Sequence, residues 1–235
     1  MHTKEKFVIS STPWHDYLRS SVLEQNLNHV FQINVAECFE TIAGQLNAVL
    51  PATEIEKASR FSNYDDAQRY LSTRFVLRKL ISTTTGQQPS SVYFGEIKNK
   101  KPVTKGIAFN ISHSANCILI TLSKYAIGID VEYISPRFDY VELISHCFDQ
   151  DEQYLINSAN DKTAMFYALW TRKEAILKAT GEGLIDDLPA LNCLSPVYRN
   201  AGSDFQLQTF ALGADYIFTL ANSHIAKTIF WNYQI

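Results

Sequence analysis

Two carboxylates separated by a single residue are the pair of side chains in the sequence best suited to chemistry. Asp130 and Glu132 lie in the segment AIGIDVEYI, whose alternation of apolar and polar residues predicts a β-strand over residues 126–134. On a strand, both side chains project from one face, while Ile129 and Val131 point to the other. Like charges this close repel unless a cation lies between them, and carboxylate oxygens suit Mg²⁺ or Mn²⁺. The pair therefore indicates either a divalent-metal site or a polar strand edge that faces solvent.

A second group of candidates lies on a helix that we predict over residues 162–180. Trp170, Glu174 and Lys178 are spaced by four residues, so they form one stripe along this helix. Lys173 places a further cation next to Glu174. An indole, a carboxylate and an ammonium group on one face could serve a phosphate-handling site. The same spacing is also typical of an ordinary Glu to Lys pair on a helix whose Trp lies in the core.

Periodicity and helix-breaking residues predict the elements that must position these side chains. Alternating patterns indicate strands, whereas a spacing of three to four apolar residues indicates helices, and glycines mark several ends. We expect strands at 29–37, within 91–124 and at 126–134, helices at 37–49, 54–81 (in one or two pieces), 140–147, 149–158 and 162–180, and a β-rich end at 195–235. Separate groups of helices and strands of this kind predict the α+β class.

The chain also shows a weak internal repeat. A shift of 98 residues places FQIN at 31–34 over IDVE at 129–132, and the same shift places STR at 72–74 over WTR at 170–172. A single offset that aligns both a strand and a long helix is what two copies of one strand–helix unit would produce.

The repeat predicts two similar α/β subdomains related by a pseudo-two-fold, each an antiparallel-rich sheet packed against a long helix. We place them at residues 1–125 and 126–235. The first copy carries Gln32 and Asn34 at the positions that hold acids in the second. We therefore expect one metal site, in the second subdomain.

Composition and charge limit the classes of protein. With 235 residues, 46% of them hydrophobic and 19% charged, the chain is typical of a globular protein and not of a disordered one. Residues 1–125 hold 14 Lys and Arg against 10 Asp and Glu, a net +4, whereas the rest holds 7 against 14, a net −7. Such a division suits an anionic ligand that carries a metal, or two solvated faces without a role.

Targeting and cysteine patterns are unremarkable. No apolar stretch has the length of a signal peptide core or a membrane span, so we expect a cytoplasmic protein without a membrane partner. The four cysteines lack CxxC or other metal-ligand spacing, and we expect free thiols.

Taken together, three motifs resemble the 4'-phosphopantetheinyl transferase superfamily. They are NISHS at 110–114, GIDVE at 128–132 and WTRKEAILK at 170–178, and their order and spacing are those of the family. The match is close at Gly128, Asp130, Glu132, Trp170, Lys173, Glu174 and Lys178. A basic segment with KKP at 100–102 resembles the longer Sfp-like subgroup, in which one chain folds as a pseudodimer. The resemblance covers roughly residues 57–183.

This resemblance implies Mg²⁺-dependent transfer of 4'-phosphopantetheine from coenzyme A to a serine of a carrier protein, with release of 3',5'-ADP. It implies catalytic roles for Asp130, Glu174 and Lys178, and metal ligation by Asp130, Glu132, Glu174 and Glu152. Either Glu174 or Glu152 could accept the serine proton. The neighbouring Asp149 and Asp151 leave the choice of Glu152 open.

The resemblance also implies the residues that bind coenzyme A and the partners. The contacts with coenzyme A are expected from Lys57, Arg60, Lys101, Ser112, His113, Lys173 and Lys178. The partner is an acyl, peptidyl or aryl carrier protein, which we expect to dock near residues 138–148, and the enzyme is expected to be a monomer that does not bind nucleic acid.

Two other functions are compatible with parts of the pattern. A Mg²⁺-dependent nuclease would also combine an acidic cluster, a lysine and a basic half, although the basic residues are not interleaved with aromatic ones. A non-catalytic module that binds coenzyme A would keep the fold, but it would be expected to have lost one of the acids or the lysine named above.

Overall fold

The computed structural model describes residues 7–18, 21–96, 102–183, 185–200 and 202–234. The helices are α1 (Val35–Ile42), η1 (Ala43–Gln45), α2 (Leu46–Val49), α3 (Ala52–Ala58), α4 (Tyr64–Thr85), η2 (Pro89–Ser91), α5 (Val141–Cys147), α6 (Gln150–Ser158) and α7 (Lys162–Thr180). The strands are β1 (Ile9–Ser10), β2 (His15–Tyr17), β3 (Asn28–Asn34), β4 (Gly95–Glu96), β5 (Pro102–Val103), β6 (Ala108–Ser114), β7 (Cys117–Ser123), β8 (Ile127–Tyr133), β9 (Val197–Asn200), β10 (Ser203–Leu212), β11 (Tyr216–Asn222) and β12 (Thr228–Tyr233). The described chain is thus α+β, as predicted.

The chain divides into two compact units. Unit 1 comprises the described residues of Met1–Pro13, Asn110–Ser112 and Tyr125–Ile225, and unit 2 comprises those of Trp14–Phe109, His113–Lys124 and Ala226–Ile235. The chain passes from unit 2 to unit 1 between Lys124 and Tyr125. Near the ends of the chain, β1 pairs with β10 of unit 1 and β12 pairs with β2 and β3 of unit 2. The division into subdomains at 1–125 and 126–235 stays a prediction.

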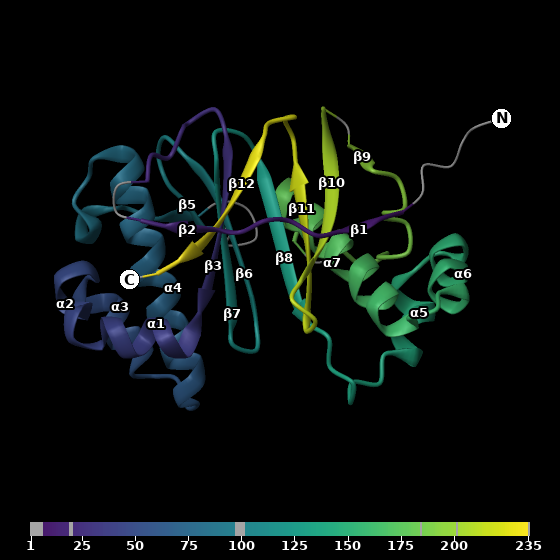
Figure 1. Ribbon diagram of the computed structural model, residues 1–235, viewed down its shortest axis with the longest axis horizontal. Coiled ribbons are helices and arrows are strands. Elements are labelled where there is room, and N and C mark those ends of the chain that lie inside the picture. The colour runs from purple at the N-terminus through teal and green to yellow at the C-terminus, as the bar shows by residue number, and fades with distance from the viewer. Residues whose placement is uncertain (1–6, 19–20, 97–101, 184, 201, 235) are drawn as a thin grey trace. The chain divides into compact units, whose positions relative to one another are not determined.

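Unit 1 is a sheet with the order β1-β10-β11-β8, to which β9 adds by pairing with β10. The pairs β8/β11 and β10/β11 are antiparallel, and β1 runs parallel to β10. Helix α7 packs against β8 and β11, and α6 packs against α7 (Figure 1). The core of the unit lies between this sheet and the helices and includes the buried side chains of Phe148, Phe166, Leu169 and Ile176.

Local signals fix both ends of α7. The Asp161 carboxylate accepts a hydrogen bond of 2.9 Å from the Ala164 backbone N–H, which satisfies a free amide of the first turn. Gly181 ends the helix with a positive φ of 75°, a conformation that a glycine adopts without strain. The helix therefore begins and ends as predicted.

Most of unit 2 is built on a sheet with the order β2-β12-β3-β7-β6, of which residues 110–112 of β6 belong to unit 1. Strands β3 and β7 are antiparallel, whereas β12 runs parallel to both β2 and β3. Helix α4 begins at its N-cap Asn63, ends at Gly86, and packs against α1, α2 and α3. The helix predicted over 54–81 is thus two helices, α3 and α4.

One predicted strand ends earlier than its sequence pattern indicates. Residues 29–37 alternate, but the Asn34 side chain accepts a 3.2 Å hydrogen bond from the Glu37 N–H and caps α1 instead. An asparagine that can cap a helix thus ends the strand.

The pseudo-two-fold relation between the subdomains stays a prediction.

Candidate functional site

Strand β8 presents Asp130 toward α7. Its neighbours Ile129 and Val131 are fully buried on the opposite face, as the alternation predicts. Asp130 is itself only 3% exposed and lies opposite Thr219 in the β8/β11 register. A carboxylate buried to this degree needs compensating contacts, because burial disfavours its charged form.

Close packing of α7 on β8 brings the helix to this carboxylate. A Cβ atom at Gly128 would lie 2.1 Å from the Ala175 carbonyl oxygen and 2.5 Å from the Ala179 nitrogen. A side chain at this position would therefore force the helix away from the strand. The glycine of the GIDVE motif is needed for this approach, which sets Glu174 and Lys178 on the face toward Asp130.

Asp130 forms one cluster with a serine and a lysine. Its Oδ1 accepts hydrogen bonds from Lys178 Nζ at 2.6 Å and from Ser112 Oγ at 2.9 Å. Ser112 Oγ in turn accepts from Lys178 Nζ at 3.0 Å and from the Val131 N–H at 3.2 Å. Because this hydroxyl donates one hydrogen bond and accepts two, it positions Asp130 and the lysine and has little capacity left for a ligand.

Asn110 supports the same strand and was not identified from the sequence. Its side-chain oxygen accepts a 3.0 Å hydrogen bond from the Ile129 N–H. Asn110 and Ser112 occupy alternate positions of β6, so both side chains reach backbone amides of β8. The sequence signal that could have identified Asn110 is the alternation of polar and apolar residues in Asn110, Ile111 and Ser112.

The second oxygen of Asp130 is unusual. Among the described residues, Oδ2 is buried and has no hydrogen-bond partner. Such an atom normally forms a bond, because leaving a buried acceptor unsatisfied costs about 1–3 kcal/mol. It is the kind of atom that a bound cation would satisfy.

Electrostatics at the cluster also favour a cation. Burial raises the pKa of Asp130, although the Lys178 ammonium and the Ser112 hydroxyl act in the opposite direction. The pKa of Glu174 is likewise raised, first by burial and then by the negative charge of Asp130, with Lys178 opposing. Two carboxylates therefore share one lysine, and both would be stabilised by added positive charge.

Glu132 lies two residues further along β8 and is half-buried. It acts on Tyr167 of α7, whose pKa is raised by burial and further by the charge of Glu132, with a backbone contact at Ser135 opposing. Across the described residues, side chains of His, Cys, Asp and Glu do not already form a group of three or more poised to hold a metal. Asp130 and Glu174 are thus the acids that the structure brings together, with Glu132 on the same strand face.

Glu152 and Lys173 form a separate buried pair. The Glu152 carboxylate lies 2.8 Å from Lys173 Nζ and also accepts the Cys193 N–H at 2.8 Å and the Asp149 N–H at 3.0 Å. Lys173 Nζ donates in addition to the Leu188 and Leu191 carbonyl oxygens. Both side chains are fully buried and their hydrogen-bonding groups are engaged. We therefore leave Glu152 out of the proposed metal ligands and Lys173 out of the proposed coenzyme A contacts.

Of the other described residues expected to contact coenzyme A, Lys57, Arg60 and His113 belong to unit 2, whereas Ser112 and Lys178 belong to unit 1. Lys57 Nζ lies 5.2 Å from the centre of the Tyr70 ring, and Arg60 forms an exposed 2.5 Å ion pair with Glu56. His113 is exposed near the end of β6. Lys101 lies outside the described residues.

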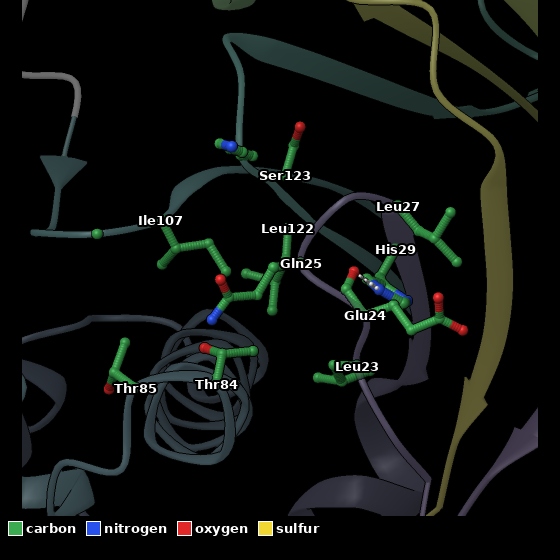
Figure 2. Close-up of a pocket in the computed structure, with 12 residues that line it drawn as sticks. Leu23, Glu24, Gln25, Leu27, His29, Thr84, Thr85, Ile107, Leu122 and Ser123 are labelled. Atoms are coloured by element: carbon green, nitrogen blue, oxygen red, sulfur yellow. Dashed lines mark hydrogen bonds between the residues drawn. The ribbon is translucent and has the colours of Figure 1, made fainter.

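Unit 2 also holds a small cavity of about 110 Å³ (Figure 2). Its lining includes Leu23, Glu24, His29 and Leu122, with Thr84 and Thr85 from the end of α4. Of the described residues predicted to bind coenzyme A, none lines this cavity. We therefore do not assign it to that ligand.

A further buried polar chain lies beside the acidic cluster. Thr219, opposite Asp130 on β11, shares hydrogen bonds of 2.9 Å with Thr171 and 3.0 Å with Thr209. All three hydroxyls are buried. The three hydroxyls thus satisfy one another's hydrogen bonds. Sequence analysis did not identify them, because isolated threonines are common and their spacing gives no signal.

Sequence comparisons identify the class of protein. The 4'-phosphopantetheinyl transferase superfamily matches residues 126–226, and the N-terminal part of 4'-phosphopantetheinyl transferases matches residues 40–124. The 4'-phosphopantetheinyl transferase AcpT of Salmonella typhi is 30% identical over 155 residues, which are 65% of this chain and 75% of that protein. The chain belongs to the 4'-phosphopantetheinyl transferase superfamily.

Two further relatives are similar over a shorter part of their length. The 4'-phosphopantetheinyl transferase HetI of Nostoc sp. (strain PCC 7120 / SAG 25.82 / UTEX 2576) is 35% identical over 59% of this chain and 62% of its own. The 4'-phosphopantetheinyl transferase Sfp of Bacillus subtilis (strain 168) is 31% identical over 55% of this chain and 59% of its own. The chain thus spans about three fifths of the length of these two curated relatives.

Within the ranges described above, every helix is too short or too polar to cross a bilayer.

Proposed function

We propose that the protein transfers the 4'-phosphopantetheine group of coenzyme A to a serine hydroxyl of a carrier protein and releases 3',5'-ADP. The observation that carries this proposal is the buried Asp130 carboxylate, whose Oδ2 lacks a partner among the described residues. Glu174 and Lys178 act on the same carboxylate. Membership of the superfamily supports the reaction class.

The site fits a divalent metal, and we propose Mg²⁺ with Mn²⁺ as a substitute. Asp130, Glu132 and Glu174 would hold the ion, since carboxylate oxygens are the ligands that hard cations prefer. When bound, the ion would neutralise the charge of the coenzyme A diphosphate. The unpartnered Oδ2 and the raised pKa values of Asp130 and Glu174 are the features that support this assignment.

Glu174 is the proposed acceptor of the serine proton. A base works best when its pKa lies close to the working pH, and the pKa of Glu174 is raised by burial and by Asp130. Glu152 was the other candidate from the sequence. Its carboxylate is fully buried and bound by Lys173 and two backbone amides, so it cannot reach a substrate.

Lys178 is proposed to stabilise the departing 3',5'-ADP phosphate. Its side chain is 29% exposed, so the ammonium can bind Asp130 and still face a ligand. A charge-assisted hydrogen bond from an ammonium to a phosphate oxygen is about twice as strong as a neutral one.

We retain Lys57, Arg60, Lys101 and His113 as proposed contacts for the nucleotide end of coenzyme A. That end carries several phosphate charges, which match the net positive charge of residues 1–125. Ser112 is proposed to act by positioning Asp130 and Lys178, because its hydroxyl is saturated by protein partners.

The carrier protein, of the acyl, peptidyl or aryl type, is proposed to dock at the segment that precedes and begins α5. There, Phe138 and Val141 are 46% and 66% exposed, whereas Phe148 is buried. Exposed apolar side chains of this kind are typical of protein contact sites. A monomeric enzyme stays a prediction.

The test is mass spectrometry of a panel of apo-carrier proteins incubated with the full chain, coenzyme A and Mg²⁺. We expect one carrier or more to gain the mass of a single phosphopantetheinyl group. The Asp130→Ala variant should give no product, and the matched Gln32→Ala variant, changed at the position that corresponds to Asp130 in the repeat, should remain active. No mass gain with any carrier, or cleavage of labelled DNA by the wild-type chain, would contradict the proposal.

A further inference from the structure

A second cavity, of about 290 Å³, lies in unit 1. Its lining does not include Asp130, Glu132, Glu174 or Lys178. We call the exposed residues of its lining the rim and the buried ones the floor. The lining residues are Phe7, Val8, Ser10, Arg172, Leu194, Pro196, Leu207, Gln208, Thr209 and Phe210.

Arg172 contributes a buried positive charge to the floor of this cavity. The residue is 4% exposed. Its guanidinium donates to the Cys193 carbonyl oxygen at 2.6 Å, to the Ser195 carbonyl oxygen at 2.5 Å and, more weakly, to Thr209 Oγ1 at 3.4 Å. A guanidinium has five N–H groups, so these contacts leave donors for a further acceptor.

No carboxylate of the described residues forms an ion pair with Arg172. The described acidic groups that act on Arg172 are Cys193, whose thiol pKa is raised by burial so that it stays neutral, and then Glu152, which forms its ion pair with the buried Lys173. Among the described residues, two buried cations thus share one buried carboxylate, and one positive charge remains. An uncompensated buried charge is costly, and an anion in the cavity would offset that cost.

The remaining lining selects the kind of anion. Phe7 lies with its ring centre 5.0 Å from the guanidinium carbon, and Leu194 and Pro196 add apolar walls. An inorganic anion would leave these walls without contacts, whereas a hydrocarbon group would fill them. A single net positive charge matches a single carboxylate, and the volume holds on the order of ten non-hydrogen atoms, at about 30 Å³ each.

We propose that this cavity binds a short-chain aliphatic monocarboxylate, whose carboxylate accepts hydrogen bonds from Arg172 and whose hydrocarbon chain contacts Phe7, Leu194 and Pro196. Site and ligand are distinct from the transferase chemistry proposed above. They do not depend on that proposal.

The test uses hexanoate, which has a carboxylate and a short chain, and its uncharged analogue hexanamide. Titration of the full-length protein, followed by the NMR resonance of the Arg172 Nε–H group, should show saturable binding of hexanoate. Because a hydrogen bond between charged groups is stronger than one with a neutral partner, hexanamide should bind at least about tenfold more weakly. Equal affinities, or no saturable binding of hexanoate up to about 10 mM, would overturn the proposal.

Two exposed valines provide a matched pair of variants that should not disturb folding. Val8 lies at the rim of the cavity and is 61% exposed, whereas Val22 belongs to unit 2 and is 76% exposed. Val8→Glu should weaken hexanoate binding through repulsion of its carboxylate, and Val22→Glu should leave it unchanged. Equal effects of the two substitutions would refute a site at this rim.

Arg172→Gln and Glu5→Gln complete the test. Arg172→Gln should abolish the preference for hexanoate over hexanamide, and a preference that survived would exclude Arg172 as the anion-binding group. Glu5 lies outside the described residues, and Glu5→Gln should bind hexanoate as the wild type does. If hexanoate bound to the Glu5→Gln variant but not to the wild type, the Glu5 carboxylate would be the natural occupant of the cavity. That result would overturn the proposal.

Discussion

Two buried carboxylates, Glu54 in unit 2 and Asp130 in unit 1, are compensated to different degrees. In unit 2, Glu54 of α3 contacts the guanidinium groups of both Arg74 and Arg78 of α4. Burial alone would raise the pKa of Glu54, but the two arginines lower it below its ordinary value. In unit 1, burial raises the pKa of Asp130, because Lys178 compensates only part of its cost. Glu54 is therefore a satisfied structural acid, whereas Asp130 still requires positive charge.

The two long helices, α4 of unit 2 and α7 of unit 1, show a similar contrast. Helix α4 begins at Tyr64 and α7 at Lys162, which is the offset of 98 residues seen in the sequence repeat. At that offset, the buried side chains of Phe75, Val76 and Leu80 in α4 correspond to those of Lys173, Glu174 and Lys178 in α7.

Helix α4 of unit 2 thus has apolar side chains at the positions where helix α7 of unit 1 has charged ones. Buried apolar groups stabilise a fold, whereas buried charges cost stability unless they are paired. The difference indicates that unit 1 gives up stability at these positions in exchange for a site that can bind charge.

The largest expected effect comes from removing the charge of Glu54, which forms the buried ion pairs with Arg74 and Arg78. Glu54→Gln would leave Arg74 and Arg78 without their carboxylate, and removal of one partner of a buried ion pair typically costs about 3–5 kcal/mol. Urea unfolding followed by circular dichroism would measure this loss. Glu56→Gln, which removes the exposed pair with Arg60, is the matched control and should cost at most about 1 kcal/mol. Similar losses in the two variants would remove the distinction between the acids.

The next effect concerns activity. Asp130→Ala should lower the rate of phosphopantetheine transfer at least about 10²-fold, and Glu174→Gln nearly as much, because each removes a charge placed for the reaction. Neither should unfold the protein, since the raised pKa values show that both acids are costly to bury in charged form. A carrier-loading assay with saturating Mg²⁺ would measure the rates. Full activity in either variant would remove that residue from the mechanism.

A smaller effect is expected at the contact between β8 and α7. Gly128→Ala would place a Cβ against the backbone of α7, and overpacking of this kind typically costs about 1–3 kcal/mol. We expect lower activity as well, because Glu174 and Lys178 would move away from Asp130. Gly44→Ala is the matched control, since nothing lies within 4 Å of a Cβ there. Unchanged stability and activity in Gly128→Ala would show that close approach is not required.

The smallest effect is a pH dependence in unit 2. The pKa of His29 is lowered from its ordinary 6.5 by burial, although the backbone and charge of Glu24 oppose this. Trp231 Nε1 donates to His29 Nδ1 at 3.1 Å, and Nε2 lies 3.0 Å from the Glu24 carbonyl oxygen (Figure 2), so the ring is neutral. Protonation would break the contact with Trp231.

The sign follows from the lowered pKa. The unfolded chain takes up the proton first, so unfolding becomes easier as the pH falls below about 6.5 and toward the pKa of the folded protein. Urea midpoints measured at several pH values should show this loss. The dependence should shrink in His29→Phe but persist in the control His15→Gln, and an unchanged dependence in His29→Phe would assign it to another group.

Much of the fold was accessible from the sequence. Helix α7 was predicted within its observed bounds because its apolar spacing is helical and Gly181 is a strong signal for a helix end. The pairing of β12 with β3 was not predicted, because it joins residues that lie 200 positions apart, such as Thr228 and Asn28. Periodicity reports which face a strand buries, but not which strand it pairs with.

The site was accessible to a similar degree. Asp130, Glu174 and Lys178 were found because their spacing places them on one strand face and one helix stripe. Lys173 was expected to contact coenzyme A because the resemblance implied it, yet neighbours on a helix differ in direction by about 100°, and Lys173 forms an ion pair with Glu152. The sequence names charged groups without showing which partners bind them.

The central claim is that Asp130 helps to bind a divalent ion. Titration of Mn²⁺ into the full-length protein, followed by electron paramagnetic resonance, tests it without reference to catalysis. We predict saturable binding of one ion by the wild type and by Gln32→Ala, and loss of that binding in Asp130→Asn. Equal Mn²⁺ binding by Asp130→Asn and the wild type would contradict the account.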